Sequence, residues 1–159
     1  RYGGNIQAHF SMKKKKYNHR IRNILKKEDH YLSNINNYKK FKLKMENSKE
    51  KLRKYILKNK EKKIVGKAFP ARASILLHYY NYLPSSLKYI AEQPQSKKLN
   101  FCAPGTNLKI ISSEEMRKNN PDVVVVLAWH LFDTIYNKWK KLFKKKVKFI
   151  KILPKFEVL

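Results

Sequence analysis

The chain has 159 residues, enough for one domain or for a domain with an arm, and its hydrophobic content of 42% argues against a disordered protein. No stretch approaches the ~18 apolar residues of a membrane span, and we recognise no signal segment. The single cysteine, Cys102, excludes an internal disulfide and suits a reducing compartment, so we expect a cytoplasmic location and no membrane partner. Because the chain begins at Arg1 and not at Met, we expect it to be a piece of a longer protein.

The net charge of +27 suggests a polyanionic partner such as nucleic acid. Most of the lysines are nevertheless spread along the chain, and only 13–16 and 144–146 form dense runs. A chain rich in Lys, Asn and Ile is also what an AT-rich coding sequence produces without selection for a ligand. Zinc-finger spacing and an aromatic RNA-binding signature are absent from the sequence. We therefore do not expect nucleic acid as the partner, and keep as the alternative a non-catalytic basic domain that binds nucleic acid or an anionic surface.

The N-terminal part of the chain has the patterns of a short strand and of long helices. Alternation of Ile6, Ala8 and Phe10 predicts a strand over 5–10. From about 13 to 60, apolar residues recur at helical spacing in narrow stripes beside broad polar faces. We expect these helices to pack along one side of a domain.

After residue 62, short apolar strands alternate with helices. The predicted strands are 63–66, 87–91, 108–111, 123–127 and 147–153. The predicted helices are 73–82, one that begins at Ser112 with a capping box to Glu115, and one that carries Leu131, Ile135, Trp139 and Leu142 on a single face. The run 123–127 is continuously apolar, as in a strand that is buried on both faces. This alternation predicts a parallel sheet with helices on both sides.

The segment 64–79 is the most informative part of the sequence. A strand ends at Gly66, a loop follows, and a helix begins near Ala73. Unpaired N–H groups and the helix dipole at such a junction can hold an anion, to which Arg72 can add a planar fork of donors. The candidate anion-binding residues are therefore Gly66, Pro70, Arg72 and Ser74. A β–α turn that binds no ligand would show the same pattern.

Other candidate residues lie close to the ends of predicted strands. Glu92 closes the second strand, where an acid can accept hydrogen bonds from ribose hydroxyls. Trp129 and His130 lie at the carboxyl end of the most buried strand, where ligands of open α/β sheets bind. The rigid turn before the third strand consists of Pro104, Gly105 and Thr106. The alternatives are loop polarity for Glu92, architecture for the turn, a core tryptophan and a surface histidine.

The sequence contains no pattern to which we can assign catalysis or a metal. The five histidines show no metal-ligand spacing, and the single cysteine adds no cluster. We also find no nucleophile–base arrangement and no pair of carboxylates. The candidate residues are therefore binding residues only.

In this order, the segments resemble the C-terminal domain of the sugar C-methyltransferases, which use S-adenosylmethionine to methylate a carbon of a nucleoside-diphosphate deoxy-keto-sugar. The family pattern Gly-Tyr-Gly-Ala-Pro-Ala-Lys-Gly-Asn-Thr-Leu-Leu-Asn-Tyr is matched by Gly66, Pro70, Ala71, Leu76, Leu77 and Tyr79, with Arg72 in place of the lysine. Its Pro-Gly-Thr turn is matched by Pro104, Gly105 and Thr106. Its Pro-Asp, strand and Trp-Asn segment is matched by Pro121, Asp122 and Trp129, with His130 in place of Asn. Its Gly-Gly-Ser-Leu-Arg-Val-Tyr opening strand is similar to residues 3–9.

The resemblance implies a three-layer, Rossmann-like parallel sheet with a helical N-terminal arm, which we divide into an arm of residues 1–61 and an α/β domain of residues 62–159. It also implies that the methyl-donor domain, a zinc-binding domain and most catalytic residues precede this region in a longer enzyme. The chain would then hold neither S-adenosylmethionine nor zinc, and would be inactive alone. Its role would be to hold the nucleoside-diphosphate sugar against the methyl-donor domain.

The chain departs from the family pattern within the loop. Lys67 and Phe69 replace Tyr and Ala, while Ala68 and Ala73 replace glycines, so the backbone can approach a phosphate less closely. Glu92 stands where the family has Asp. The distribution of charge distinguishes the two functions: positive charge focused at the carboxyl edge of the sheet favours nucleotide-sugar binding, and charge spread along the helical arm favours the basic-domain alternative.

Overall fold

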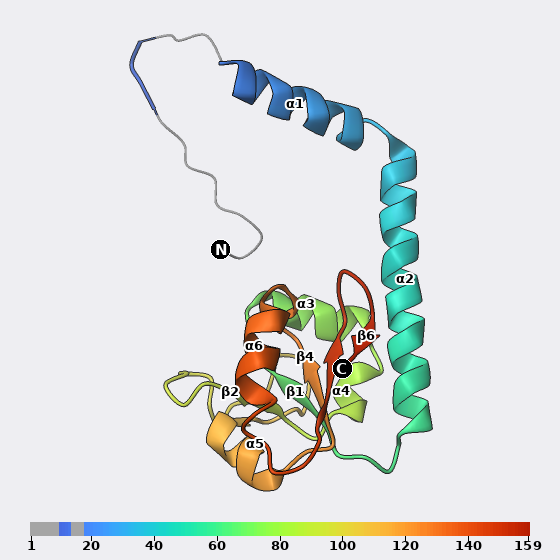
Figure 1. Ribbon diagram of the computed structural model, residues 1–159, viewed down its shortest axis with the longest axis vertical. Helices are drawn as coiled ribbons and strands as arrows, with labels where there is room; N and C mark the ends of the chain where they lie inside the picture. Colours follow the sequence, from blue (N-terminus) through green and yellow to red (C-terminus); the bar gives the residue numbers. More distant parts are fainter. Residues whose placement is uncertain (1–9, 14–17) are drawn as a thin grey trace. The chain divides into compact units, whose positions relative to one another are not determined.

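The computed structural model describes residues 10–13 and 18–159. Most of the predicted opening strand lies outside these residues, and Phe10, its last residue, is exposed and belongs to no strand. The chain divides into two compact units, Arg1–Met45 and Glu46–Leu159, and the boundary falls inside a long helix. Figure 1 shows the helices and strands in chain order, coloured from blue to red.

Two helices form the N-terminal part of the described chain, which confirms the predicted helical arm. α1 (His19–Leu32) begins after Asn18, whose side chain accepts a hydrogen bond from the Ile21 N–H at 3.0 Å. α2 (Ile35–Lys58) follows after a short break. No residue of α1 is buried, and burial is confined to the second half of α2. The buried residues of α2 are Ser48, Leu52 and Ile56.

A six-stranded sheet forms the centre of the second unit. The strands are β1 (Ile64–Lys67), β2 (Ile90–Glu92), β3 (Ile110–Ser112), β4 (Val123–Val126), β5 (Lys148–Lys151) and β6 (Glu157–Val158). Their order is β3-β2-β1-β4-β5-β6, in which β6 runs antiparallel to β5 and all other neighbours are parallel. This is the strand order of dinucleotide-binding sheets. The predicted α/β class with a parallel, Rossmann-like sheet is therefore confirmed.

Helices cover both faces of the sheet, so this unit has three layers. The helices that follow the first strand are α3 (Arg72–Tyr79), α4 (Leu83–Ser86), α5 (Ser113–Asn119) and α6 (Phe132–Trp139). α3, α4 and the second half of α2 share one apolar core with alternate strand residues, whereas α5 and α6 share the other core. In β4, Val123 and Val125 belong to the first core, and Val124 and Val126 belong to the second. This alternation confirms that β4 is buried on both faces.

Three predicted elements end earlier than the sequence pattern suggests. α3 ends at Tyr79, and Pro84 lies in the first turn of α4, where its missing N–H breaks no helical hydrogen bond. The closing parallel strand ends at Lys151, and the chain then returns as β6, which the sequence pattern did not predict. α6 ends at Trp139, so Leu142 lies beyond the helix and is 40% exposed.

The loop between β1 and α3 contains a strained residue. Ala68 has a φ of 63°, in the left-handed region that an alanine enters at a cost of ~1–2 kcal/mol. Hydrogen bonds hold it there: the Ala68 N–H donates to the Ala91 carbonyl at 2.9 Å, and the Phe69 N–H donates to the Glu92 carboxylate at 2.7 Å. The glycine of the family pattern would adopt this conformation without strain.

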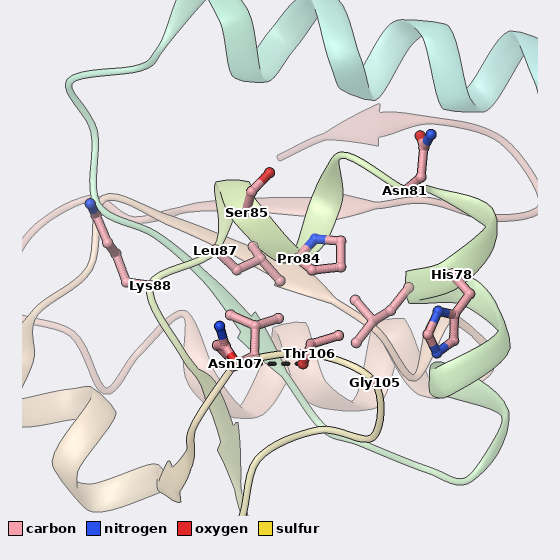
Figure 2. A pocket seen from close by; sticks show the side chains of 11 residues that line it. His78, Asn81, Pro84, Ser85, Leu87, Lys88, Gly105, Thr106 and Asn107 are labelled. Atoms are coloured by element: carbon pink, nitrogen blue, oxygen red, sulfur yellow. Dashed lines mark hydrogen bonds between the residues drawn. The ribbon is translucent and has the colours of Figure 1, made fainter.

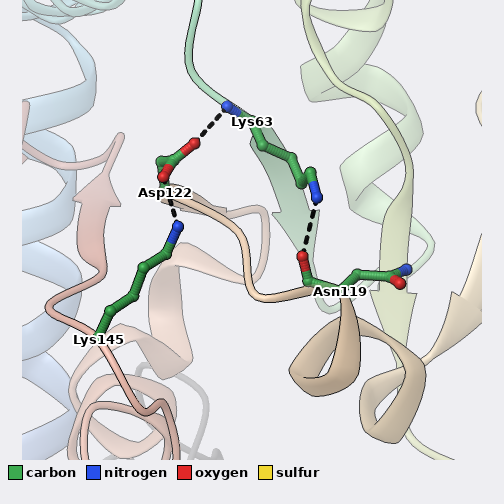
Figure 3. Close-up of polar contacts among 4 residues, drawn as sticks. All are labelled: Lys63, Asn119, Asp122 and Lys145. Atoms are coloured by element: carbon green, nitrogen blue, oxygen red, sulfur yellow. Dashed lines mark hydrogen bonds and ion pairs between the residues drawn. The ribbon is translucent and has the colours of Figure 1, made fainter.

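Asp122 connects three segments beside the first residues of β1, β4 and β5 (Figure 3). Its carboxylate accepts hydrogen bonds from the Lys145 ammonium at 2.6 Å and from the Lys63 N–H at 2.7 Å. The Lys63 ammonium in turn donates to the Asn119 carbonyl at 2.9 Å. The bonds from Lys145 and from the Lys63 N–H hold the pKa of Asp122 below its usual value.

We expect Ala68→Gly to raise the free energy of unfolding by up to ~1 kcal/mol, because relief of the left-handed strain exceeds the extra chain entropy of glycine. Ala71→Gly is the control, since Ala71 has a φ of −50°, which an alanine adopts freely. Denaturant unfolding of both variants measures the difference. A gain at both positions, or none at Ala68, would contradict the assignment of strain.

We expect Asp122→Ala to lower the free energy of unfolding by ~1–2 kcal/mol at neutral pH, because a charge-assisted hydrogen bond and an exposed ion pair are lost. The folded-state pKa of Asp122 lies below its unfolded value. Its contribution is therefore present above the unfolded pKa of about 3.9 and is lost as the pH falls through the folded pKa.

Denaturant unfolding at neutral and acidic pH measures this contribution. The control is Asp133→Ala, which removes an ion pair with Lys151 at 3.7 Å from a side chain that is 82% exposed. Its loss should stay below ~1 kcal/mol. An Asp122→Ala loss that is equal at both pH values, or no larger than that of the control, would disprove the role of Asp122.

Candidate functional site

The order of the strands places a topological switch point between β1 and β4. From β1 the chain passes to β2 on one side, and from β4 it passes to β5 on the other, so the loops after these two strands diverge from a common point. Ligands of open α/β sheets bind at such a point, outside the carboxyl ends of the strands. We call this region the carboxyl edge and define it by residues 68–74 after β1, 92–98 after β2 and 127–131 after β4.

The structure places the predicted residues Arg72, Trp129 and His130 at the carboxyl edge. Burial, and then the nearby Arg72 charge, lower the pKa of His130. The lowered pKa favours the neutral imidazole at pH 7, in which one ring nitrogen is a donor and the other an acceptor. Trp129 lies edge-on to the His130 ring, with 5.7 Å between the ring centroids, and also packs against the core on the α3 side of the sheet.

α3 begins at the carboxyl edge without a capping side chain. Its N-cap residue, Ala71, makes no side-chain hydrogen bond, and no acidic residue lies in the first turn. The Ala73 N–H donates to the Pro70 carbonyl at 2.8 Å. The Ser74 N–H donates to the Ala71 carbonyl at 3.2 Å, a longer bond. With the exposed Arg72 at the first helical position, this helix start carries positive charge that an anion could neutralise.

Glu92 holds the loop after β1 in place. One carboxylate oxygen accepts the Phe69 N–H at 2.7 Å, and the other accepts the Gln93 N–H at 2.9 Å. The Lys98 ammonium donates to the Phe69 carbonyl at 2.5 Å, so Phe69 is held at both its N–H and its carbonyl. Each carboxylate oxygen of Glu92 keeps a second lone pair for a ligand, which leaves the predicted ribose contact open.

Lys67 is a buried cation at this edge that our sequence analysis did not select. Its side chain is 3% exposed, and its ammonium donates to the Ser113 hydroxyl at 2.6 Å and lies 4.8 Å from the centre of the Trp139 ring. The Ser113 hydroxyl donates in turn to the Glu92 carbonyl at 2.6 Å. Burial lowers the pKa of Lys67 to about 8, against the opposing charge of Glu92. A lysine inside a buried apolar strand was the signal that could have identified it.

Two predicted site segments lie away from the carboxyl edge as defined above. Gly66 lies inside β1, where a Cβ atom would come within 3.1 Å of Ile90 and 3.2 Å of Leu127 and would require these side chains to shift, so its role there is in packing. The turn of Pro104, Gly105 and Thr106 comes just before Leu108 and β3. It therefore lies at the end where the parallel strands begin, which we call the amino edge.

Positive charge is not concentrated at the carboxyl edge. The residues immediately before β1 and β3 are Lys63 and Lys109, and Lys88 comes two residues before β2, so all three lie at the amino edge. Lysines also occur throughout α1 and α2. The charge distribution therefore does not by itself favour nucleotide-sugar binding over the basic-domain alternative.

Within residues 10–13 and 18–159, no group of three or more His, Cys, Asp or Glu side chains could hold a metal ion. The same part of the chain contains no helix of the length and apolarity required to cross a membrane. The candidate site consists of the switch point of a parallel sheet with an exposed arginine, a histidine and a tryptophan beside it.

Comparison with known proteins identifies the family of the chain. The family described as C-methyltransferase C-terminal domain matches residues 1–154, nearly the whole chain. No curated protein matched the chain. The matched region includes the loop after β1, the turn before β3 and the segment after β4, all of which carry the resemblance seen in the sequence. The chain belongs to the C-methyltransferase C-terminal domain family.

Proposed function

We propose that this domain binds the nucleotide part of a nucleoside-diphosphate sugar at the carboxyl edge and holds the sugar toward the methyl-donor domain of a longer enzyme. The observation that supports the proposal is the reversal of strand order between β1 and β4, with Arg72 in the loop region after β1 and His130 in the segment after β4, close enough for the Arg72 charge to act on the imidazole. Membership of the methyltransferase family supplies the reaction class.

Each candidate residue at the carboxyl edge would have a binding role that its chemistry supports. The diphosphate would lie at the start of α3, where Arg72 can pair with two of its oxygens at once. Trp129 offers a flat apolar surface to the base or the sugar. The neutral His130 would hydrogen-bond a hydroxyl or carbonyl group without bringing a second charge close to Arg72. Glu92 would keep the loop in shape through its bond to the Phe69 N–H.

The methyl donor does not fit the residues of this chain. The loop after β1 contains no glycine between Ala68 and Ala71, and Ala68 already occupies a strained conformation there. As the family resemblance implies, we expect a preceding domain of the longer enzyme to hold S-adenosylmethionine, which would supply the methyl group, and structural zinc. Residues of this chain would bind and orient the sugar nucleotide only.

We expect Arg72→Ala to weaken the binding of a nucleoside diphosphate by roughly ten- to a hundredfold, the loss typical of a bidentate charge-assisted contact. Arg72→Lys should lose less, because the charge remains while the planar fork is lost. Calorimetric titration of the protein that includes its upstream domain measures these affinities, and thermal melting checks that each variant is folded.

The matched control for this titration is Arg117→Ala. Arg117 is also an exposed helical arginine, but it lies in the last turn of α5, near the amino edge. Its loss should leave the affinity unchanged. Equal affinities of wild type and Arg72→Ala, or equal losses in the two arginine variants, would mean that the loop after β1 is only a turn.

The basic-domain alternative is supported by the fully exposed, lysine-containing α1. If this charge is only a solvated surface, we expect duplex DNA to bind weakly, without sequence preference, and to lose affinity steeply between ~50 and ~200 mM salt through counterion release. Fluorescence anisotropy with labelled duplexes of different sequence measures this. Tight binding to one sequence at physiological salt would favour the alternative over the proposed function.

A further inference from the structure

A second pocket lies at the amino edge, away from the proposed nucleotide site. It encloses about 480 Å³ between the end of α3, α4 and the turn of residues 104–107 (Figure 2). Lys88 and Leu108, which precede β2 and β3, line it and place it where these strands begin. A volume of this size suits a small ligand and not a polymer.

The pocket combines an apolar floor with a polar rim that has no carboxylate. The floor consists of Leu77, Leu87 and Leu108, which are all buried in the core on the α3 side. The rim consists of His78, Asn81, Ser85, Lys88, Thr106 and Asn107. Every polar side chain of the rim can donate a hydrogen bond, and Lys88 is the only lysine or arginine among them.

Most of these donors are unused by the protein. Ser85 and Thr106 donate to the Tyr82 and Ala103 carbonyls at 2.9 and 2.8 Å. Within the described chain, the other rim side chains make no hydrogen bond or ion pair, and neither do the backbone N–H groups of Gly105 and Asn107. A ligand could therefore engage them without breaking an existing bond.

The wall that carries His78 depends on Gly105. Gly105 has a φ of 70°, and a Cβ atom there would lie 2.7 Å from Cε1 of the His78 ring. Glycine thus allows the turn to lie directly against the imidazole. In Figure 2, His78 lies beside this turn, and Lys88 lies on the opposite side of the pocket. The pocket therefore has a lysine at one end, whose ammonium extends outward from the other labelled side chains (Figure 2), and hydrogen-bonding side chains at the other end.

This arrangement points to an anionic, polyhydroxylated ligand. Lys63 and Lys109, which precede the strands on either side of β2, add positive potential around Lys88. The amides of Asn81 and Asn107 and the imidazole of His78 can each donate to and accept from hydroxyl groups. We propose that the pocket binds a small sugar phosphate ester, with its phosphate at Lys88 and its hydroxyl groups toward His78, Asn81 and Asn107.

Titration followed by amide NMR shifts tests the proposal, with glucose 6-phosphate, glucose and inorganic phosphate as separate probes. We expect glucose 6-phosphate to shift the Lys88, Thr106 and Asn107 resonances saturably and to bind more tightly than either fragment, since only the ester supplies both phosphate and hydroxyl groups. Lys88→Ala should weaken its binding about tenfold or more. If inorganic phosphate bound with the same affinity, the pocket would be a phosphate site, and the proposal that it binds a sugar phosphate ester would be wrong.

The matched control is Lys109→Ala, which removes an exposed lysine of the same edge that does not line the pocket. It should retain nearly full affinity, and an equal loss in the two lysine variants would show diffuse charge attraction in place of a site. Arg72→Ala should leave glucose 6-phosphate binding intact, and Lys88→Ala should leave nucleoside diphosphate binding intact. The absence of saturable shifts in a protein with a wild-type thermal melt would overturn the proposal, whatever the result at the carboxyl edge.

Discussion

The structure depends on the burial of its two central strands. Every residue of β1 and β4 is buried, and the two strands pair in parallel from Ile64 and Val123 to Lys67 and Val126. Complete burial of a valine side chain contributes ~1.5–3 kcal/mol, so the four valines of β4 together supply an amount comparable to the net stability of a typical domain. Because both faces of these strands must be covered, helices on both sides are required. The connections from β1 and from β4 leave in opposite directions, which creates the switch point at the carboxyl edge.

Hydrogen bonds between polar groups connect the elements that meet at the carboxyl edge. Lys67 is the last residue of β1 and its side chain is buried. Its ammonium donates to the Ser113 hydroxyl and lies over the face of the Trp139 ring. The Ser113 hydroxyl donates in turn to the Glu92 carbonyl. The Glu92 carboxylate accepts the Phe69 N–H, which directly follows the strained Ala68. β1, β2 and the start of α5 are thus joined by hydrogen bonds at the end of the sheet where the loops meet. Such support holds loop residues in position before a ligand arrives.

The two edges of the sheet differ in chemistry. The carboxyl edge has an uncapped helix start, one exposed arginine and a neutral histidine beside a tryptophan. The amino edge has lysines in front of successive strands and a pocket whose rim lacks acids. The sheet separates them, so a ligand at one edge does not contact a ligand at the other.

The sequence by itself determined the class of the fold and the order of its elements, because these follow from local patterns. The β-branched run of β4 predicted a doubly buried strand, and Ser112 caps α5 by accepting the Glu115 N–H at 3.1 Å, as its spacing predicted. Local spacing also placed Arg72 at a helix start and His130 after the most buried strand. That the Arg72 charge lies close enough to act on His130 was predictable only by assuming a parallel sheet.

Only the tertiary structure decided which edge each loop reaches. The segment after β2 runs back beside β3, where the Ile110 N–H donates to the Phe101 carbonyl at 2.8 Å, and so carries the Gly105 turn to the amino edge. β6 pairs with β5, although no alternation of apolar and polar residues in the sequence predicted a strand there. The burial of Lys67 likewise depends on α5 and α6, which follow it far along the chain. Periodicity encodes which face of an element is apolar, whereas pairing between distant strands decides where its ends lie and which side chains surround them.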